Sequence, residues 1–445
     1  MASANESSGG TFAGGETAGT GAGTAPGAPA GAARPVKVGI TYPDTAAIAA
    51  AFGQESHDAS DFIQKIVDYI NKTGGIAGRP IAPVYHRVDL TEDGSAAGQR
   101  ACTALTQDKK VDIVINGGVV GETLAACLGK AGVSVLDGAN VPTDAEDERR
   151  LPNRFSPSGF RMDRSVMAIL NGSAKQGRIK KGDTLGVVVE DCPGPNRIFS
   201  KLLLPRAQQL GLKVVQGTHK CVQNIVSDLG PVTNDIQREA LRFASAGVTH
   251  VLMISGPEAF VVSRFTETAS QQKYYPKYFV SSQAYPFNNS RSGATVKIAE
   301  DARPNVSGWG AIPLLDVGGG AKPANPQQLA AQQRCRKADP NEGLTRGSSS
   351  GDDPSFNRSV YLGLCDTFYA LKAMLETNGV RYTLPEVTKG FHVGLGGDRT
   401  ASANLTGGFF GAGPNRLDGV GYVRPFAYDT SRKVFVYIGD AVAVP

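Results

Sequence analysis

The sequence lacks several features that would place it in a familiar class. No apolar run reaches the roughly 18 residues that a helix needs to span a bilayer. The net charge is only +5, from 46 basic and 41 acidic side chains without a dense basic run. This balance argues against nucleic acid as a partner. Met1 leads directly into a polar, glycine-rich segment and not into an apolar signal sequence.

Catalytic signatures are also missing. The chain contains no G-x-x-x-x-G-K-[ST], H-E-x-x-H or G-x-S-x-G motif, and no G-x-G-x-x-G after a strand. Its five histidines stand singly along the chain: His57, His86, His219, His250 and His392. The sequence therefore predicts a protein that is not an enzyme, with no catalytic residue, no cofactor and no metal ion.

Cysteine is scarce but evenly distributed. The six cysteines form three neighbouring pairs of similar separation, none in a C-x-x-C: Cys102 and Cys127, Cys192 and Cys221, Cys335 and Cys365. An even set without metal-type spacing indicates disulfides and an oxidising compartment. Six cysteines allow fifteen pairings, so the neighbouring pairing is one choice among them. Each such loop would add about 3 kcal/mol of stability, and buried free thiols are the alternative.

The beginning of the chain differs in composition from the rest. Residues 1–35 are mostly Gly, Ala, Ser, Thr and Pro, with almost no large apolar side chains. Such a segment cannot bury enough surface to offset its ordering entropy, so we expect a flexible tether. A tether ahead of an exported body suggests attachment to the outer face of the cell membrane. A lipid-modified cysteine upstream, which this sequence does not contain, would provide the anchor.

From Val36 onward, short apolar strands alternate with amphipathic helices. The run 36–42 predicts a strand, and 61–71 predicts a helix that ends at Gly74–Gly75. Further strands are expected to begin at Ile81, Val111, Val133, Leu185, Lys213, Thr249 and Lys277. Because short apolar strands between helices are typical of covered parallel sheets, and because the array restarts near Leu185, we predict an α/β fold of two similar lobes.

Three later segments break this alternation. Residues 317–356 are rich in Gly, Pro, Ser, Asn and Gln, which predicts a surface excursion. Residues 359–377 have the apolar spacing of a helix, with Leu362, Phe368 and Leu375 mostly on one side. The last stretch predicts two strands joined by a turn at 429–433.

Ligands of open α/β sheets bind beyond the carboxyl ends of the strands. The candidate ligand-binding residues therefore lie in strand-end loops: Tyr42, Gly118, Val119, Val120, Ala139 and Asn140 in the first array, and Gly194, Asn196, Gly256, Gln283 and Tyr285 in the second. The loop 117–123 leads into a helix whose first N–H groups would suit an anion, although a tight turn without a ligand fits equally. Tyr42, Tyr285 and Trp309 suit either a pocket wall or the core.

Four of these segments together resemble a known family. The runs VKVGITYP from Val36, NKTGGIAGRPI from Asn71, VDIVING from Val111 and LGVVVED from Leu185 are similar to type I periplasmic binding proteins. Within that family they look most like the leucine/isoleucine/valine-binding receptors of ABC transporters. The resemblance covers Val36 to the end of the chain, and the spacing of Cys102 and Cys127 looks like the family's first-lobe disulfide.

The resemblance implies two lobes joined by a three-strand hinge, with chain crossings near residues 157, 309 and 418. Lobe 1 would comprise 36–157 and 310–418, and lobe 2 would comprise 158–309 and 419–445. Such a protein lies outside the cytoplasm, closes over a small molecule and delivers it to ABC permease subunits.

The resemblance carries less information about the ligand. In the stretch that matches the family's carboxylate-binding serines, this chain has Val119, Val120 and Gly121. Gln283 stands where the family often has an acid, and a neutral amide cannot pair with an ammonium group as a carboxylate does. We therefore expect either an amino acid-like ligand or a less charged amide, aromatic or bulky metabolite. A sensory or scaffold ectodomain with the same fold is the alternative function.

Overall fold

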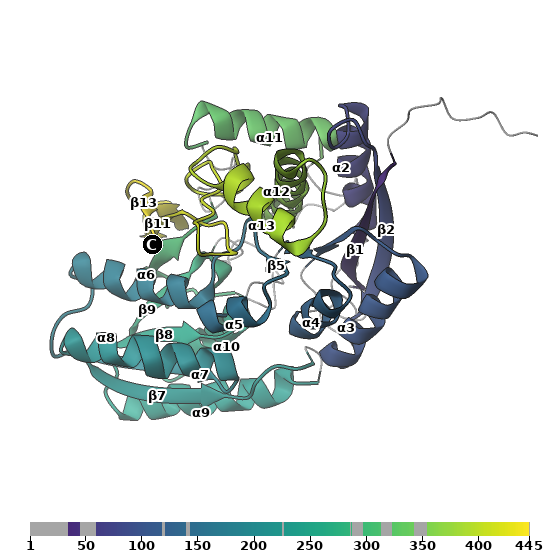
Figure 1. Cartoon of the computed structure of the whole chain (residues 1–445). Coiled ribbons are helices and arrows are strands. Elements are labelled where there is room, and N and C mark those ends of the chain that lie inside the picture. The colour runs from purple at the N-terminus through teal and green to yellow at the C-terminus, as the bar shows by residue number, and fades with distance from the viewer. Residues whose placement is uncertain are drawn as a thin grey trace, which may run out of the picture. The chain divides into compact units, whose positions relative to one another are not determined.

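Two sheets of mostly parallel strands organise the chain in the computed structural model (Figure 1). The structure describes residues 34–44, 59–117, 121–138, 143–224, 227–284, 286, 297–312, 323–341 and 354–444, without side chains for 354–360. The tether predicted for 1–35 lies outside these residues, apart from its last two positions.

The first sheet has five parallel strands in the order β2-β1-β3-β4-β5. These strands are β1 (Val36–Asp44), β2 (Ile81–Asp89), β3 (Ile113–Asn116), β4 (Val135–Asp137) and β5 (Arg154–Phe155). The helices between them are α2 (Ser60–Lys72), α3 (Gly94–Thr103), continued by the π-helical turn Ala104–Asp108, α4 (Glu122–Lys130) and α5 (Ala145–Arg150). We call this sheet and the helices that pack on it the first lobe.

Alternation along the strands explains why this sheet is covered on both faces. Successive side chains of a strand point to opposite faces. Ile113 and Ile115 accordingly join the hydrophobic cluster that contains α2, whereas Val114 joins the one formed by α3 and α4. In β1, Gly39 faces α3 and α4, where an added Cβ would lie 3.0 Å from Leu105 Cδ2. The sequence thus leaves room for the packed helix at that point.

The second sheet has the order β12-β11-β10-β9-β8-β6-β7, with β13 paired to β11. Its strands are β6 (Thr184–Glu190), β7 (Lys213–His219), β8 (His250–Ile254), β9 (Lys277–Ser281), β10 (Val306–Gly310), β11 (Tyr422–Asp429), β12 (Val434–Tyr437) and β13 (Val442–Ala443). Its helices are α6 (Met162–Lys175), α7 (Pro193–Arg197), the π-helical turn Ile198–Leu203, α8 (Leu204–Gln209), α9 (Leu229–Ser245) and α10 (Glu258–Gln271), with short 3-10 turns at Ser282–Ala284 and Arg303–Asn305. This sheet and its helices form the second lobe. The predicted terminal strand pair is confirmed by the antiparallel pairing of β11 with β12.

Three helices that follow β10 belong to the first lobe. They are α11 (Pro326–Ala338), α12 (Pro354–Asn378) and α13 (Leu384–Leu395), and both α11 and α12 pack against α2 (Figure 1). The stretch 317–356, predicted as a surface excursion, contains α11, which is exposed on one face and packed on the other. On the packed face, the amides of Gln328 and Gln332 are buried and donate to backbone carbonyls of Leu405 and Ala403.

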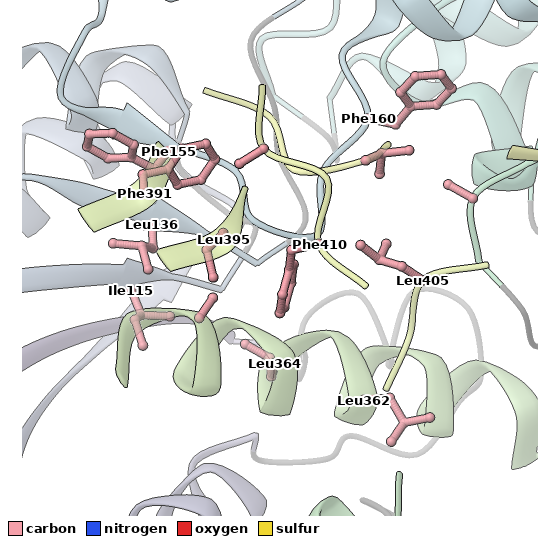
Figure 2. Packing of buried hydrophobic residues seen from close by; sticks show 14 of the residues in the cluster. Ile115, Leu136, Phe155, Phe160, Leu362, Leu364, Phe391, Leu395, Leu405 and Phe410 are labelled. Carbon is pink, nitrogen blue, oxygen red and sulfur yellow. The ribbon is translucent and has the colours of Figure 1, made fainter. Parts of the chain in front are cut away.

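The largest hydrophobic cluster joins the strands of the first lobe to α12, α13 and the segment around Phe410. Figure 2 shows this region, with Phe155 and Phe391 against one another and Leu364 on α12 below the strands. The Phe155 and Phe391 ring centroids lie 5.3 Å apart. Burial of such side chains is the dominant favourable contribution to the stability of a lobe.

All three predicted disulfides are confirmed. Cys102–Cys127, Cys192–Cys221 and Cys335–Cys365 are bonded, with sequence separations of 25, 29 and 30. The first joins α3 to α4, and the third joins α11 to α12, so both link helices of the first lobe. The second joins the loops that follow β6 and β7 in the second lobe.

The chain passes between the two sheets after β5, after β10 and after α13. The first and third passages run side by side, because the Ser156 N–H donates to the Leu417 carbonyl (2.7 Å) and the Gly419 N–H donates to the Ser156 carbonyl (2.9 Å). An added Cβ at Gly419 would overlap the Pro157 carbonyl, so only glycine permits this close approach.

Buried charges flank these passages. Arg164 pairs with Asp418 and also donates to the carbonyls of Val420 and Val444. Arg161 pairs with Asp163 (2.7 Å) and with Glu148. Each arginine thus has a carboxylate partner, as buried charges require.

Within the described residues, no helix is both long and apolar enough to cross a bilayer.

Candidate functional site

A hydrogen-bonded chain of polar side chains runs along the carboxyl edge of the first sheet. Thr41 at the end of β1 donates to Asn116 Oδ1 of β3 (2.9 Å), and Asn116 Nδ2 donates to Asp137 of β4 (2.8 Å). Arg154 of β5 closes the chain with an ion pair to Asp137 at 2.5 Å. Burial raises the pKa of Asp137, and the Arg154 charge opposes that rise. This network fixes the edge from which the loops 117–121 and 138–143 begin.

The carboxyl edge of the second sheet is organised around Glu190, the last residue of β6. Its carboxylate accepts the backbone N–H groups of Val222 (2.9 Å) and Gly256 (2.7 Å), and therefore ties together the loops after β6, β7 and β8. Beside it, His219 Nδ1 lies 2.8 Å from the Lys220 carbonyl, and Nε2 lies 3.0 Å from Ser255 Oγ. Because a carbonyl only accepts, Nδ1 carries the proton and Ser255 donates to Nε2. Burial lowers the pKa of His219.

A second carboxylate holds the loop that carries Gln283. Glu258, the first residue of α10, accepts both the backbone N–H of Ser281 (2.7 Å) and its hydroxyl. The Ser281 Oγ in turn accepts the Gln283 N–H at 2.9 Å. Burial raises the pKa of Glu258 to about 7. The half-buried side-chain amide of Gln283 has no hydrogen-bond partner among the described residues.

Asn404 is a candidate site residue that the sequence did not suggest. It is 5% exposed, and its Oδ1 has no hydrogen-bond partner among the described residues. The loop that bears it is fixed by Asp366, which accepts the N–H groups of Ala403 and Asn404. A buried amide oxygen without a partner costs about 1–3 kcal/mol. A ligand that donates a hydrogen bond would remove this cost.

Asn404 and Gln283 lie on the two sides of the passage that follows β10. The Thr406 N–H donates to the Ala311 carbonyl (2.7 Å), and the Ala311 N–H donates to Ser282 Oγ (3.2 Å). The Ala311 backbone therefore joins the Asn404 loop of the first lobe to the Gln283 turn of the second. Gln283 and Asn404 thus belong to segments that are joined through Ala311, where the chain passes from one lobe to the other.

Two polar bridges connect strand-end segments of the two lobes. Arg197 on α7 donates to both oxygens of Asp144 (2.7 and 3.0 Å) and to Asp147 on α5 (2.7 Å). The hydrogen bond from Arg197 to Asp144 raises the pKa of the guanidinium. Elsewhere, Asn224 Nδ2 donates to the carbonyls of Thr91 (3.0 Å) and Glu92 (3.1 Å). The lobes are therefore in contact at two separate places.

The structure describes five of the eleven predicted ligand-binding residues. Gly256 and Gln283 lie on adjacent loops of the second edge, held by Glu190 and Glu258. Gly194 packs against Thr143 of the first lobe, where an added Cβ would overlap the hydroxyl. Asn196 donates to Asp191 in its own loop (2.9 Å). These four stay predictions as ligand contacts.

Tyr42 lies in the hydrophobic core. It is 8% exposed, and its ring meets that of Tyr85 edge to face, with centroids 6.1 Å apart. Strand alternation explains this placement, because Tyr42 shares a face of β1 with the buried Val38 and Ile40. The sequence left two roles open for Tyr42, a pocket wall or the core, and the structure places its side chain in the core. The remaining predicted residues lie outside the described part of the chain: Gly118, Val119, Val120, Ala139, Asn140 and Tyr285.

One group among the described residues has the proximity of metal ligands. It consists of Glu190, Cys192 and Cys221. Both sulfurs belong to one disulfide, and the carboxylate already accepts two backbone N–H groups. Since metal coordination by cysteine needs a free thiolate, this group is part of the loop scaffold.

Comparison with solved structures shows the same two-lobed fold in ABC-transporter binding proteins. A solute-binding protein from Rhodopseudomonas palustris BisB5, in complex with 3,4-dihydroxybenzoic acid, aligns with a TM-score of 0.62 and 15% identity, covering 92% of this chain and 97% of the other. A branched-chain amino acid protein from Thermus thermophilus with bound valine aligns with a TM-score of 0.60 and 16% identity, covering 93% and 97%. A substrate-binding protein from Aeropyrum pernix gives 0.63 and 12% identity, covering 93% and 97%.

Comparison of the sequence with curated proteins and with family models gives two results. No curated protein matches the chain. A family model described as "Periplasmic binding protein" matches residues 35–309. That match covers both βα arrays and agrees with the resemblance found in the sequence. The chain belongs to the periplasmic binding protein family.

Proposed function

We propose that this protein is the solute-binding receptor of an ABC importer and captures a small molecule between its two lobes. Members of this family are solute-binding proteins, and membership implies an extracytoplasmic location. The observation that carries the proposal is that the Asn404 oxygen and the Gln283 side chain lack partners among the described residues and belong to segments joined through Ala311. Permease subunits are the partners that this role requires.

We also propose the lobe boundaries at residues 157, 309 and 418. The packing of α11 and α12 on α2 supports the assignment of 310–418 to the first lobe. The pairing of β11 with β10 supports the assignment of 419–445 to the second. Attachment to the membrane through a lipid upstream of residues 1–35 remains a prediction.

The proposed ligand is a small molecule that has no ammonium group and therefore needs no carboxylate partner. The described acids of both edges are already engaged: Asp137 by Arg154, Glu190 by two N–H groups and Glu258 by Ser281. Gln283 offers a neutral amide, which suits a hydroxyl, an amide or a carboxylic acid as partner. A hydroxylated aromatic acid, the kind of compound bound by the Rhodopseudomonas palustris protein, fits these groups.

Titration calorimetry tests this proposal directly. The panel comprises 3,4-dihydroxybenzoate, 4-hydroxybenzoate, valine, glutamine and benzamide. We expect saturable binding of an aromatic acid or amide, and a loss of about tenfold in affinity in Gln283→Ala from the removed hydrogen bonds. The Gln283→Glu variant should bind acids still more weakly, and it should bind valine more tightly than the unmodified protein does. Tight binding of valine by the unmodified protein would contradict the proposed ligand class, and the absence of binding across a broader panel would contradict the receptor function.

A further inference from the structure

A cavity of about 360 Å³ lies in the second lobe, apart from the strand-end loops. It is open to solvent on one side and lined by one face of α6, by β10 and β11, by Leu202 and by residues 442–444. Its lining residues are Asp163, Arg164, Met167, Ala168, Asn171, Gly172, Lys175, Leu202, Trp309, Val423, Val442, Ala443 and Val444. None of the eleven candidate ligand-binding residues is among them, whereas Trp309, which suited either a pocket wall or the core, is part of the wall.

Most of the wall is apolar. The Trp309 ring lies directly on α6 at Gly172, where an added Cβ would overlap the indole. Leu202 and Val442 line the cavity although they are 39% and 43% exposed. A molecule bound in this hollow would cover the apolar surface that these two side chains expose.

The polar groups of the cavity divide into two sets. Arg164 and Asp163 are engaged, the first with Asp418 and the second with Arg161. Lys175, by contrast, is exposed, and no described acid pairs with it. The Asn171 oxygen accepts a bond from Arg206 (2.7 Å), and its amide N–H groups have no acceptor among the described residues.

Trp309 adds one more donor. Its indole N–H has no acceptor among the described residues. The polar lining groups without a described partner are therefore the Lys175 ammonium, the Asn171 amide N–H groups and the Trp309 indole N–H, on the edge of the ring that packs on Gly172. All three donate, and no uncommitted carboxylate lines the described wall, so the cavity complements an anion with an apolar body.

We propose that this cavity is a second small-molecule site, for an amphipathic carboxylate whose acid group meets Lys175 and whose hydrocarbon part packs on Trp309. The volume lies at the low end of the range for small-molecule pockets, which favours a medium-chain acid over a long lipid. The proposal does not depend on binding between the lobes.

The chain provides its own reporter for this site, because Trp309 is its only tryptophan. Decanoate is titrated into the whole protein while tryptophan emission is recorded. We expect a saturable change in emission, at least tenfold weaker apparent binding of decan-1-ol, and an affinity that falls about fourfold for each methylene removed from the acid. A linear, unsaturable response would overturn the proposal.

Two variants and a matched control separate the site from its surroundings. Lys175→Gln should weaken decanoate at least tenfold, and Ala168→Phe should abolish binding because it fills the cavity. Lys180→Gln, which removes an exposed lysine that does not line the cavity, should leave binding unchanged. If Lys175→Gln bound decanoate with unchanged affinity, the proposed contact between the Lys175 ammonium and the carboxylate would be overturned.

The outcome is distinguishable from that of the receptor proposal. Ala168→Phe should retain the binding of an aromatic acid measured by calorimetry, and Gln283→Ala should retain the decanoate response. If Gln283→Ala abolished the decanoate response and Ala168→Phe did not, the acid would bind between the lobes. That result would overturn the second site and leave the receptor function intact.

Discussion

The guanidinium of Arg197 donates to both carboxylate oxygens of Asp144, and this fork joins the second lobe to the first. Their side chains are only 19% and 10% exposed, so the pair is partly protected from water. A two-pronged contact of this kind fixes orientation as well as distance. It exists only while the lobes are in contact, and it therefore favours the closed arrangement.

Arg197→Ala should weaken closure. We expect the ligand found by calorimetry to dissociate faster, with about a tenfold loss of affinity, equal to roughly 1.4 kcal/mol. Small-angle scattering of the unliganded variant should give a larger radius of gyration. Arg238→Ala, whose partners Asp235 and Glu239 lie on its own helix, is the control and should change neither quantity. Equal dissociation rates in the two variants would refute the closing role.

The Cys192–Cys221 disulfide should affect ligand binding, because it joins the two loops that carry Arg197 and Asn224. Replacing both cysteines by serine should lower the free energy of unfolding by about 2–4 kcal/mol. It should also lower the affinity for the ligand several-fold. The matched control is removal of Cys335–Cys365. Its separation of 30 residues is close to 29, so the chain-entropy loss is similar, yet the affinity should not change. A parallel loss of affinity in both variants would show that the effect is general destabilisation.

Glu258 should make stability depend on pH. Its pKa in the folded protein is raised by burial from 4.5 to about 7, so the folded state binds the proton more tightly than the unfolded chain. The contribution is therefore fully present below pH 4.5 and is lost as the pH rises to about 7, by up to roughly 3 kcal/mol. Denaturant unfolding at several pH values, compared with Glu258→Gln, isolates this contribution from that of Asp366, whose pKa is raised to about 6 in the same direction. Parallel pH profiles for the two proteins would contradict this assignment.

Asn404→Ala should have opposite effects on stability and binding. Removing a buried oxygen without a partner should leave the free energy of unfolding unchanged or raise it by up to about 1 kcal/mol, while ligand affinity falls about tenfold. The control is Asn153→Ala, because Asn153 Nδ2 donates to the carbonyls of Ala125 (2.9 Å) and Val133 (3.1 Å). That variant should lose about 1–3 kcal/mol of stability. Retained affinity in Asn404→Ala would remove this residue from the site.

The sequence predicts the sheets well because strand alternation and helical spacing are local signals. Val38 and Ile40 on one face of β1, with Gly39 on the other, already describe a strand covered on both sides. The same local reading misses α11. Its buried amides, Gln328 and Gln332, are satisfied by carbonyls more than 70 residues away, and no local pattern reveals such partners.

The candidate site was predictable only in part for the same reason. Gly256 and Gln283 follow strands that can be recognised, so their place at the carboxyl edge could be expected. Asn404 follows no strand and belongs to no motif. Gly194 shows the opposite error: it stands at a strand-end loop as predicted, but its neighbour is Thr143 of the other lobe. The position of a loop follows from the sequence, whereas what covers it depends on the packing of the lobes.

The tight pairing of the first and third passages limits how the lobes can move. Ser156 is bonded to both Leu417 and Gly419, and Gly419 leaves no gap at Pro157, so these two segments cannot slide past one another without breaking both hydrogen bonds. Any change in the relative position of the lobes that keeps these bonds must therefore move the first and third passages together.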